Sequence, residues 1–539
     1  MTTAPSPTAD FTGTGQATTS DDGPGHGPMA VAMVVVLGSL LPVLDMTVVN
    51  VALNHLSQGF DAPLVTIQWV ATGYTLALAT VIPITAWAVG RFGTKRLCMF
   101  SIGLFAFGSA LAGLAWNAES LIAFRVLQGL GGGMIMPVGM TIIIRAADPE
   151  RMGRMMSILG IPVLVGPLAG PILGGWLVDD VSWRWIFFIN VPIGMLALIL
   201  AARIFPRDTP RPTHRLDLPG LLMLSPGLTA LIYGLAVGGE RSDPGSAGAL
   251  VPTVLGVVLV TAFVARALTA RHPLIDLRLF RRRPFTAAAG TLTLFACAYF
   301  GSMLLLPLYY QVVRGQSAAA SGLLGVPQVM ATGITMQIAG RLIDKIATGR
   351  IVLTGVGLAS AGFLAFTTQV GAHTPYWVLV GALSVMGVGV GMTMMPTTAA
   401  ATRNLSHEEV PVASTTLNII QQVAVSAGTA LMSVLLAGAI ADRLPATAGS
   451  GLGAVHALGA RHAIAPRLAD AFQHTYGWAV ALMLVALCRL YCCPAACQSP
   501  QPHPRIRRIE SQALSPRRRR RRQTAAKSWA GLVCWRGCP

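Results

Sequence analysis

An acidic residue stands inside a segment that is otherwise apolar. Asp45, in the stretch "LDMTVVN", lies well inside the run from Met29 to Leu53. A charged side chain at the centre of a bilayer costs about 2.5–3.5 kcal/mol on insertion scales, so such residues usually face a cavity or a partner. We expect Asp45 to take up and release a proton. The alternative is a carboxylate that neighbouring helices or a cation satisfy, with a packing role only.

A basic and an amide side chain occur together in another apolar run, "FRVLQGLGGG". Arg125 and Gln128 are three residues apart and therefore share a helix face. A buried guanidinium keeps its charge and can influence a nearby acid or backbone carbonyl groups. The alternative is an arginine whose side chain extends to the membrane surface, because Arg125 lies only one to two turns from the preceding loop.

Glycine and proline alternate in a third run, "GPLAGPILGGW". Glycines spaced four apart make a smooth stripe that another helix backbone can approach closely, and prolines bend membrane helices. We expect this stripe to form an interface that opens and closes; the alternative is ordinary helix packing. The residues concerned are Gly166, Pro167, Gly170, Pro171, Gly174 and Gly175.

The elements that must hold these residues are long apolar runs. The 539-residue chain is 53% hydrophobic and only 11% charged, against about 25% charged in soluble domains. A β-barrel would show alternating segments of about 10 residues, and these runs are longer and continuous. We predict an all-α membrane protein with fourteen spans, at 29–53, 64–89, 97–116, 120–144, 155–178, 184–203, 216–238, 247–268, 285–313, 319–340, 351–370, 376–400, 410–440 and 472–490.

Basic residues predict the orientation of these spans. Most lysines and arginines in the loops follow the even-numbered spans, and cytoplasmic loops are enriched in both. Both termini should then be cytoplasmic, in a bacterial plasma membrane. The net charge of +18 needs no nucleic acid to explain it. Residues 1–28 resemble a short disordered leader rather than a signal peptide.

The end of the chain changes character. Residues 491–539 are rich in cysteine and carry the run "SPRRRRRR". A frameshifted C-terminus, a genuine disordered basic tail that could touch anionic lipid, and a metal-binding appendix are the three interpretations. The cysteine spacing matches no regular zinc site.

The spans fall into two groups of six. Residues 29–203 and 285–490 hold closely spaced spans, while 204–284 holds two more between proline- and arginine-rich connectors. A weak repeat, "GRFGTKR" at 90–96 and "GRLIDKIATGR" at 340–350, supports the division. The layout and its motifs resemble the 14-helix drug:proton antiporter branch of the major facilitator superfamily, over about residues 29–490.

The resemblance implies roles for the residues above. It associates Asp45, Arg125 and Gln128 with proton coupling, and the glycine-proline run with the antiporter motif of exporters. It treats "WRWIFFINVPIG", 183–194, mainly as a structural signature.

The loop after the second span departs from the family pattern. The family has glycine and aspartate where this chain has Ala86 and Gly90, which puts the conformational coupling of the first half in doubt. The second half keeps the acidic residue. The residues we assign to conformational switching in these two loops are Gly90, Arg91, Gly93, Lys95, Arg96, Gly340, Asp344 and Lys345.

A substrate pocket could draw on polar residues of several spans. Asn418, Gln421 and Gln422 share one helix face and could bind a substrate or a neighbouring helix. Asn50 and Tyr309 are further candidates. Tyr310, Met392, Met394 and Met395 could line an adaptable apolar pocket, although core packing is their more usual role.

The expected function is secondary transport by two halves that rock about a midplane site. Inward proton flow would drive small amphipathic drugs or antibiotics outward. The alternatives are a metabolite, siderophore or amino-acid exporter of the same fold, and a non-functional frameshifted product. No GxxxxGK[ST] loop is present, and no histidine lies deep in a span. We therefore expect no enzyme activity, no cofactor and no metal, in a chain that is monomeric.

Overall fold

The computed structural model describes most of the chain between Gly27 and Cys492. The described residues are 27–62, 64–146, 155, 157–206, 216–240, 245–271, 273–316, 318–343, 345–403, 405–406, 409–443 and 465–492. The leader 1–26 and the tail 493–539 lie outside them, so the predictions made for these two segments stay predictions.

The first half is a bundle of helices in which several spans are broken into pieces. The predicted span 64–89, for example, continues through a short 3-10 turn, and 184–203 begins with a separate helical turn. Its elements are α1 (Pro28–Gly59), α2 (Leu64–Val81), η1 (Ile82–Ile84), α3 (Thr85–Phe92), α4 (Thr94–Gly113), α5 (Ala118–Ala146), α7 (Ile161–Trp176), the π-helical turn η2 (Leu177–Val181), α8 (Trp185–Phe188) and α9 (Asn190–Ile204).

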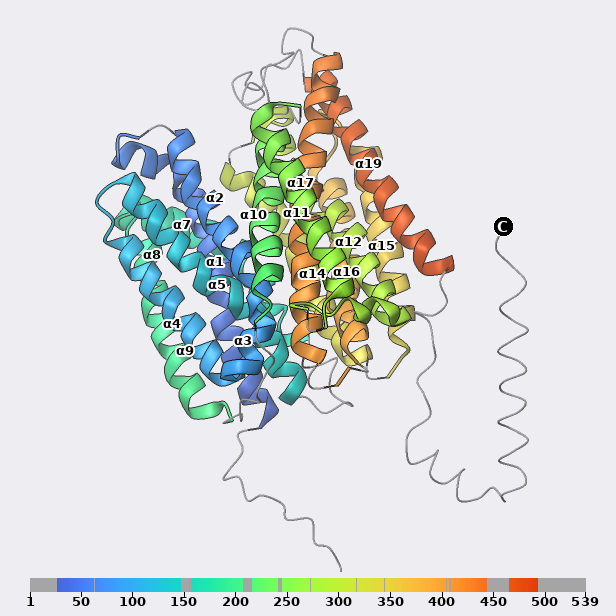
Figure 1. The fold of residues 1–539 in the computed structure, drawn as a ribbon. Coiled ribbons are helices and arrows are strands. Elements are labelled where there is room, and N and C mark those ends of the chain that lie inside the picture. The colour runs from blue at the N-terminus through green and yellow to red at the C-terminus, as the bar shows by residue number, and fades with distance from the viewer. Residues whose placement is uncertain are drawn as a thin grey trace, which may run out of the picture.

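The second half follows an inserted pair of helices. Figure 1 shows the two bundles side by side, with the inserted helices α10 and α11 in front of the seam between them. The elements are α10 (Leu218–Glu240), α11 (Ala247–Thr269), η3 (Leu277–Arg281), α12 (Arg283–Met303), α13 (Leu305–Leu308), the π-helical turn η4 (Tyr309–Val313), α14 (Ala318–Ile343), α15 (Thr348–Gln369), α16 (Tyr376–Thr402), α17 (Glu409–Arg443) and α19 (Ala465–Cys492).

Every predicted span coincides with helix, and no strand occurs among the described residues. Twelve helical segments of the described chain are long and apolar enough to cross a membrane. The predicted spans 155–178 and 319–340 are not among these twelve. Their helices are α7, which has only 16 residues before its π-helical turn, and α14, which carries Gln328 and Gln337 among its apolar residues. The last span starts at Ala465 rather than at 472.

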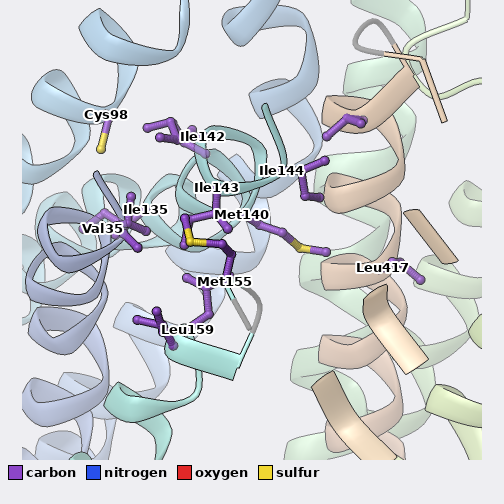
Figure 2. Packing of buried hydrophobic residues seen from close by; sticks show 14 of the residues in the cluster. Val35, Cys98, Ile135, Met140, Ile142, Ile143, Ile144, Met155, Leu159 and Leu417 are labelled. Atoms are coloured by element: carbon purple, nitrogen blue, oxygen red, sulfur yellow. The ribbon is translucent and has the colours of Figure 1, made fainter. Parts of the chain in front are cut away.

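Among the described residues, the hydrophobic core that the two halves share lies at one end. We call this the basic end: α3, α5, α9 and α11 end there, and α4, α12 and α17 begin there. One cluster of buried residues joins both halves at the basic end, including Val35, Ile143 and Ile144 with Phe285 and Leu417. Figure 2 shows Met140 and Ile144 on the side of α5 that faces α17, which contributes Leu417. Towards the opposite end, the buried clusters belong to one half each.

Polar contacts join the halves at the same place. Thr141 Oγ of α5 lies 3.1 Å from Ser414 Oγ of α17. Gln337 Nε2 of α14 donates to the Ser157 carbonyl at 3.0 Å, and the Ser157 hydroxyl donates to Gln337 Oε1 at 3.2 Å. The basic end is therefore closed by apolar packing and by hydrogen bonds between the halves.

The inserted helix α10 touches both halves. Its Thr229 hydroxyl lies 2.6 Å from that of Thr80 in α2, and its Tyr233 ring stacks on Trp69 of α2 with 5.7 Å between ring centres. On another side, Leu224 and Leu228 belong to a cluster that includes Ile419 and Val423 of α17. Helix α11 packs on α10 and leaves most of its own apolar surface exposed.

Asp217 ties the beginning of α10 to the end of α11. Arg266 donates to Asp217 Oδ1 from Nε at 3.0 Å and from Nη2 at 2.8 Å, and the Gly220 and Leu274 amides also donate to this carboxylate. Burial raises the pKa of Asp217, but these hydrogen bonds and the Arg266 charge more than offset it. The pKa of Asp217 consequently lies below its ordinary value of 3.8.

Candidate functional site

The centre of the first half contains a fully buried ion pair. Arg125 Nη1 of α5 donates to Asp45 Oδ2 of α1 at 2.5 Å, and each residue is 1% exposed. A buried charge without a partner is strongly unfavourable, and removing one member of such a pair typically costs about 3–5 kcal/mol. The two residues therefore constrain each other and hold α1 against α5.

Two amide side chains complete the coordination of the carboxylate. Asp45 Oδ1 accepts from Gln128 Nε2 at 2.9 Å and from Asn190 Nδ2 at 3.0 Å. Gln128 in turn accepts from Arg125 Nη1 at 2.7 Å, and Asn190 also donates to Ser109 Oγ at 3.1 Å. Charge-assisted hydrogen bonds of this kind are stronger than neutral ones, so the network links α1, α4, α5 and α9 through one carboxylate.

The guanidinium of Arg125 is enclosed by α2 and α8. Its Nε donates to the Val70 carbonyl at 3.2 Å. Its central carbon lies 4.2 Å from the centre of the Tyr74 ring and 5.7 Å from that of Phe187, within the range of a cation–π interaction. The Tyr74 hydroxyl is buried and has no hydrogen-bond partner among the described residues.

Asp45 of α1 and the pair Arg125 and Gln128 of α5, which the sequence singles out in two different apolar runs, thus lie in one cluster. Arg125 does not extend to the membrane surface, because its side chain is buried and bound to Asp45. Three further members of the cluster, Asn190, Ser109 and Tyr74, are not singled out by the sequence. Asn190 is a polar residue inside an apolar span and within "WRWIFFINVPIG", which is the signal that could have found it.

The glycine stripe of α7 packs against α1 on either side of Asp45. A Cβ atom on Gly166 would overlap Val43, one on Gly170 would lie 2.5 Å from Thr47 Cβ, and one on Gly174 would lie 3.3 Å from Val48 Cα. The Thr47 hydroxyl also donates to the Gly166 carbonyl at 3.1 Å. A Cβ atom on Gly175 would meet nothing within 4 Å.

The same helix reaches the second half. Gly160, which directly precedes α7, lies so close to Met336 of α14 that a Cβ atom would overlap its side chain. Helix α7 thus contacts α1 along its length and α14 at the basic end. Pro167 and Pro171 lie within α7, and their side chains are outside the described part.

The loop "GRFGTKR" forms the turn between α3 and α4. Gly93 has φ 86° and ψ 160°, which a residue with a side chain rarely adopts. The Lys95 ammonium group donates to the carbonyls of Ala202 and Phe205 at 2.6 and 2.7 Å, where α9 ends. A cation there satisfies terminal carbonyls and complements the helix dipole. Lys95 therefore holds the end of α9 against α4.

The remaining residues of the two repeat loops have less defined surroundings. Gly90 lies in α3, and Arg91 and Arg96 are exposed beside it. Gly340 is buried near the end of α14, and Lys345 is exposed after it. Asp344 lies outside the described residues. The switching role assigned to these positions stays a prediction.

Polar residues of α17 continue the face that contacts α5. Asn418 lies four residues after Ser414, and Gln421 lies seven residues after Ser414. All three side chains therefore share one helix face. Ser414 is fully buried at the contact with α5, whereas Asn418, Gln421 and Gln422 are half-buried. Asn418 Nδ2 donates to the Ser414 carbonyl at 2.8 Å. This face of α17 is buried against α5 at Ser414, and it becomes partly exposed further along the helix.

The other pocket candidates lie elsewhere. Tyr309 is fully buried beside Phe366 and Phe472, and its hydroxyl donates to the Gly371 carbonyl at 2.8 Å. Tyr310 is buried next to it, and Met392, Met394 and Met395 pack against the hydrophobic clusters. The side chain of Asn50 is outside the described part. Among the described residues, no group of three or more His, Cys, Asp or Glu side chains could hold a metal ion.

Comparison with known proteins identifies relatives of this chain. Residues 35–429 match the model of the Major Facilitator Superfamily. The chain is 44% identical over 412 residues to "Multidrug resistance protein B homolog" of Mycobacterium tuberculosis, covering 76% of each protein. It is 30% identical over 417 residues to "Multidrug export protein EmrB" of Escherichia coli, covering 76% of this chain and 81% of that protein.

Solved structures agree on the fold. The proton:xylose symporter XylE superposes with a TM-score of 0.58 at 14% identity, covering 86% of this chain and 95% of that one. The human organic anion transporter MFSD10 gives 0.56 at 15% identity, covering 86% and 99%. With two helical halves, an inserted pair and a matching family model, this chain is a member of the major facilitator superfamily, and hence a membrane transporter and not an enzyme.

Proposed function

We propose that the protein exports small amphipathic compounds, drugs or antibiotics among them, in exchange for protons across a bacterial plasma membrane. The names of its relatives support export of several drugs. The single observation that carries proton coupling is the buried carboxylate of Asp45, which is held by a buried guanidinium at the centre of the first half. If this carboxylate takes up a proton, it loses its charge, and its ion pair with Arg125 is weakened.

The proton acts through the Asp45–Arg125 pair. A proton on Asp45 Oδ2 cancels the carboxylate charge, so the 2.5 Å ion pair becomes an ordinary hydrogen bond or breaks. Arg125 keeps its charge and then depends on Gln128, the Val70 carbonyl and the Tyr74 ring. The hold of α1 on α5 therefore weakens when Asp45 is protonated.

Helix α7 carries the change to the second half. Because the glycine stripe fits α7 closely against α1, a shift of α1 near Asp45 moves α7 with it. The beginning of α7 lies on α14 through Gly160 and Met336, beside the Ser157–Gln337 hydrogen bonds. These are contacts that must separate when the basic end opens. Protonation of Asp45 and opening of the basic end are then coupled through the movement of α1 and α7.

We assign the observed arrangement to the outward-facing state. Cytoplasmic loops are enriched in basic residues, which supports a cytoplasmic location for the basic end, and both halves are packed together there. Substrate would bind between the halves beyond this closure, along the face of α17 that carries Asn418, Gln421 and Gln422. Partly exposed amides in an otherwise apolar surface suit compounds that need a few hydrogen bonds and much apolar contact.

The test is drug efflux from cells that express wild type, Asp45→Asn or Asp61→Asn, each with and without a proton uncoupler. Asp61 is an exposed carboxylate at the end of α1 and serves as the matched control. We expect uncoupler-sensitive efflux from wild type and Asp61→Asn. Asp45→Asn, present in the membrane at equal amounts, should fall to the level of cells without the transporter. Efflux by Asp45→Asn at the wild-type rate, with the same sensitivity to the uncoupler, would rule out Asp45 as the proton carrier.

A further inference from the structure

The chain that leads from α11 into α12 carries a dense positive charge at the basic end. We call residues 271–283 the arginine segment, because they include five arginines against one acidic residue, Asp276. Loops on the cytoplasmic side of a membrane are generally rich in basic residues, so this charge alone does not indicate a binding site. The way in which the structure holds the segment is more informative.

The first part of the arginine segment is packed against the inserted helices. Leu274 and Ile275 are buried in one cluster with Phe263 and Ala267 of α11. The Leu274 amide also donates to the Asp217 carboxylate at 3.3 Å. The segment therefore folds back onto the end of α11, where this span leaves the apolar core of the membrane.

The middle of the segment is the 3-10 helix η3, which contacts α11. The Asp276 carboxylate accepts from the Arg278 amide at 2.9 Å and so begins this helix. Side chains three residues apart are eclipsed in a 3-10 helix, so Arg278 and Arg281 lie on the same face, and both are exposed. Leu279 between them is buried in the core that the two halves share. Two guanidinium groups are thus presented side by side from an anchored turn.

The arginines differ in whether the protein satisfies them. Arg282 pairs with the carboxylate of Glu409, the first residue of α17. The guanidinium groups of Arg278, Arg281 and Arg283, by contrast, make no hydrogen bond or ion pair with any described residue. Guanidinium groups form their strongest hydrogen bonds with carboxylates and phosphates. These three are therefore free to bind an anion from outside the chain.

The neighbouring apolar surface indicates what kind of anion this is. Leu268 in the last turn of α11 is 70% exposed, and Val264, one turn earlier on the same face, is 38% exposed. Both belong to a helix that is long and apolar enough to cross the membrane. A ligand held at η3 would thus have its charged part on the arginines and an apolar part beside α11. A phospholipid combines these two parts in one molecule.

We infer that the arginine segment binds the head group of an anionic phospholipid. Arg278 and Arg281 hold the phosphate, and Arg283 adds positive charge two residues further on. The acyl chains lie along the exposed face of α11 that carries Leu268. Since Arg282 in the same segment is tied to α17, the bound lipid stabilises the junction between the inserted helices and the second half. This site is independent of the compound that the protein transports.

Lipid-dependent melting of the detergent-solubilised full chain tests this inference. The test variant removes the three unpaired arginines, and the control variant removes three other exposed arginines of the basic end, at the ends of α14 and α16 and at the start of α15, so that both lose the same charge. The test variant is Arg278→Gln/Arg281→Gln/Arg283→Gln, and the control variant is Arg341→Gln/Arg350→Gln/Arg403→Gln. Without added lipid, both should melt like wild type, because none of these side chains has a partner among the described residues.

Dioleoylphosphatidylglycerol, an anionic lipid, should raise the melting temperature of wild type. One basic residue at an anionic lipid surface contributes about fivefold in affinity, so the test variant should need on the order of 100 times more of this lipid for the same rise. The control variant should need about as much as wild type. Dioleoylphosphatidylcholine, which has no net charge, and inorganic phosphate, which has no acyl chain, should stabilise far less.

Three results would overturn the inference. Equal stabilisation of the test and control variants by dioleoylphosphatidylglycerol would show that the arginine segment is not the site. Equal stabilisation of wild type by dioleoylphosphatidylcholine would show a general need for lipid rather than recognition of its charge. Stabilisation by inorganic phosphate at the same concentration would show that the arginines bind a free anion without any contribution from the face of α11.

Discussion

Replacing Gly170 by alanine should separate α7 from α1. The new Cβ atom would lie 2.5 Å from Thr47 Cβ, whereas carbon atoms in contact are about 3.5–4.0 Å apart. Rotation of the Thr47 side chain could move its hydroxyl away but not its Cβ atom, whose position the backbone fixes. The helices must therefore move apart by about 1 Å at this point.

The energetic effect follows from two opposing contributions. Overpacking of this kind typically costs about 1–3 kcal/mol, while alanine is better than glycine in a helix interior by about 1 kcal/mol. Gly175→Ala is the matched control, because its Cβ atom would meet nothing within 4 Å and only the helix preference remains. The difference between the two variants isolates the packing contribution.

Both stability and transport should report the difference. We expect Gly170→Ala to melt below Gly175→Ala, and to export drug several-fold more slowly at equal amounts in the membrane, because α7 can no longer follow α1 closely. Gly175→Ala should behave like wild type or be slightly more stable. Equal melting temperatures and equal efflux for the two variants would refute the assignment of the glycine stripe to a close helix interface.

Two further predictions concern hydrogen-bonded carboxylates. Asn190→Ala removes a donor to Asp45 Oδ1 and to Ser109 Oγ, so it should destabilise the protein by about 1–3 kcal/mol in thermal unfolding and slow efflux; an unchanged melting temperature would show that the contact is dispensable. Asp217→Asn should lower the melting temperature at pH 7 by about 1 °C, since the partner Arg266 is partly exposed. Because the pKa of Asp217 is below 3.8 in the folded protein, its contribution is complete above that pH and disappears as the pH falls further. The difference between wild type and Asp217→Asn should therefore shrink below about pH 4, and a constant difference would contradict the ion-pair explanation.

The helices could be predicted from composition because a membrane span needs a continuous apolar run, which the sequence displays directly. The central charges could be predicted for the same reason: Asp45 and Arg125 are conspicuous where charges are expensive. The residues that hydrogen-bond to these two charged groups could not be predicted from the sequence. Whether Asn190 or Asn50 reaches the carboxylate depends on the rotation of each helix about its axis, and rotation is set by packing between helices rather than by hydropathy.

The position of the inserted helices α10 and α11 could not be predicted from the sequence either. Apolar residues cover α10 and α11 on all sides, which is compatible with any place at the edge of a bundle. The contacts of Thr229 with Thr80 and of Tyr233 with Trp69 decide where α10 lies.

The place of α10 has a consequence for any rocking motion. Its contacts with α2 are directional, a hydroxyl pair and two stacked rings, while its contacts with α17 are aliphatic. Aliphatic surfaces in a bilayer lose little when they slide, because lipid tails are as apolar as leucine. Helix α10 should therefore move with the first half and slide over α17. It would then shield the space between α2 and α17 from lipid acyl chains at every stage of the transport cycle.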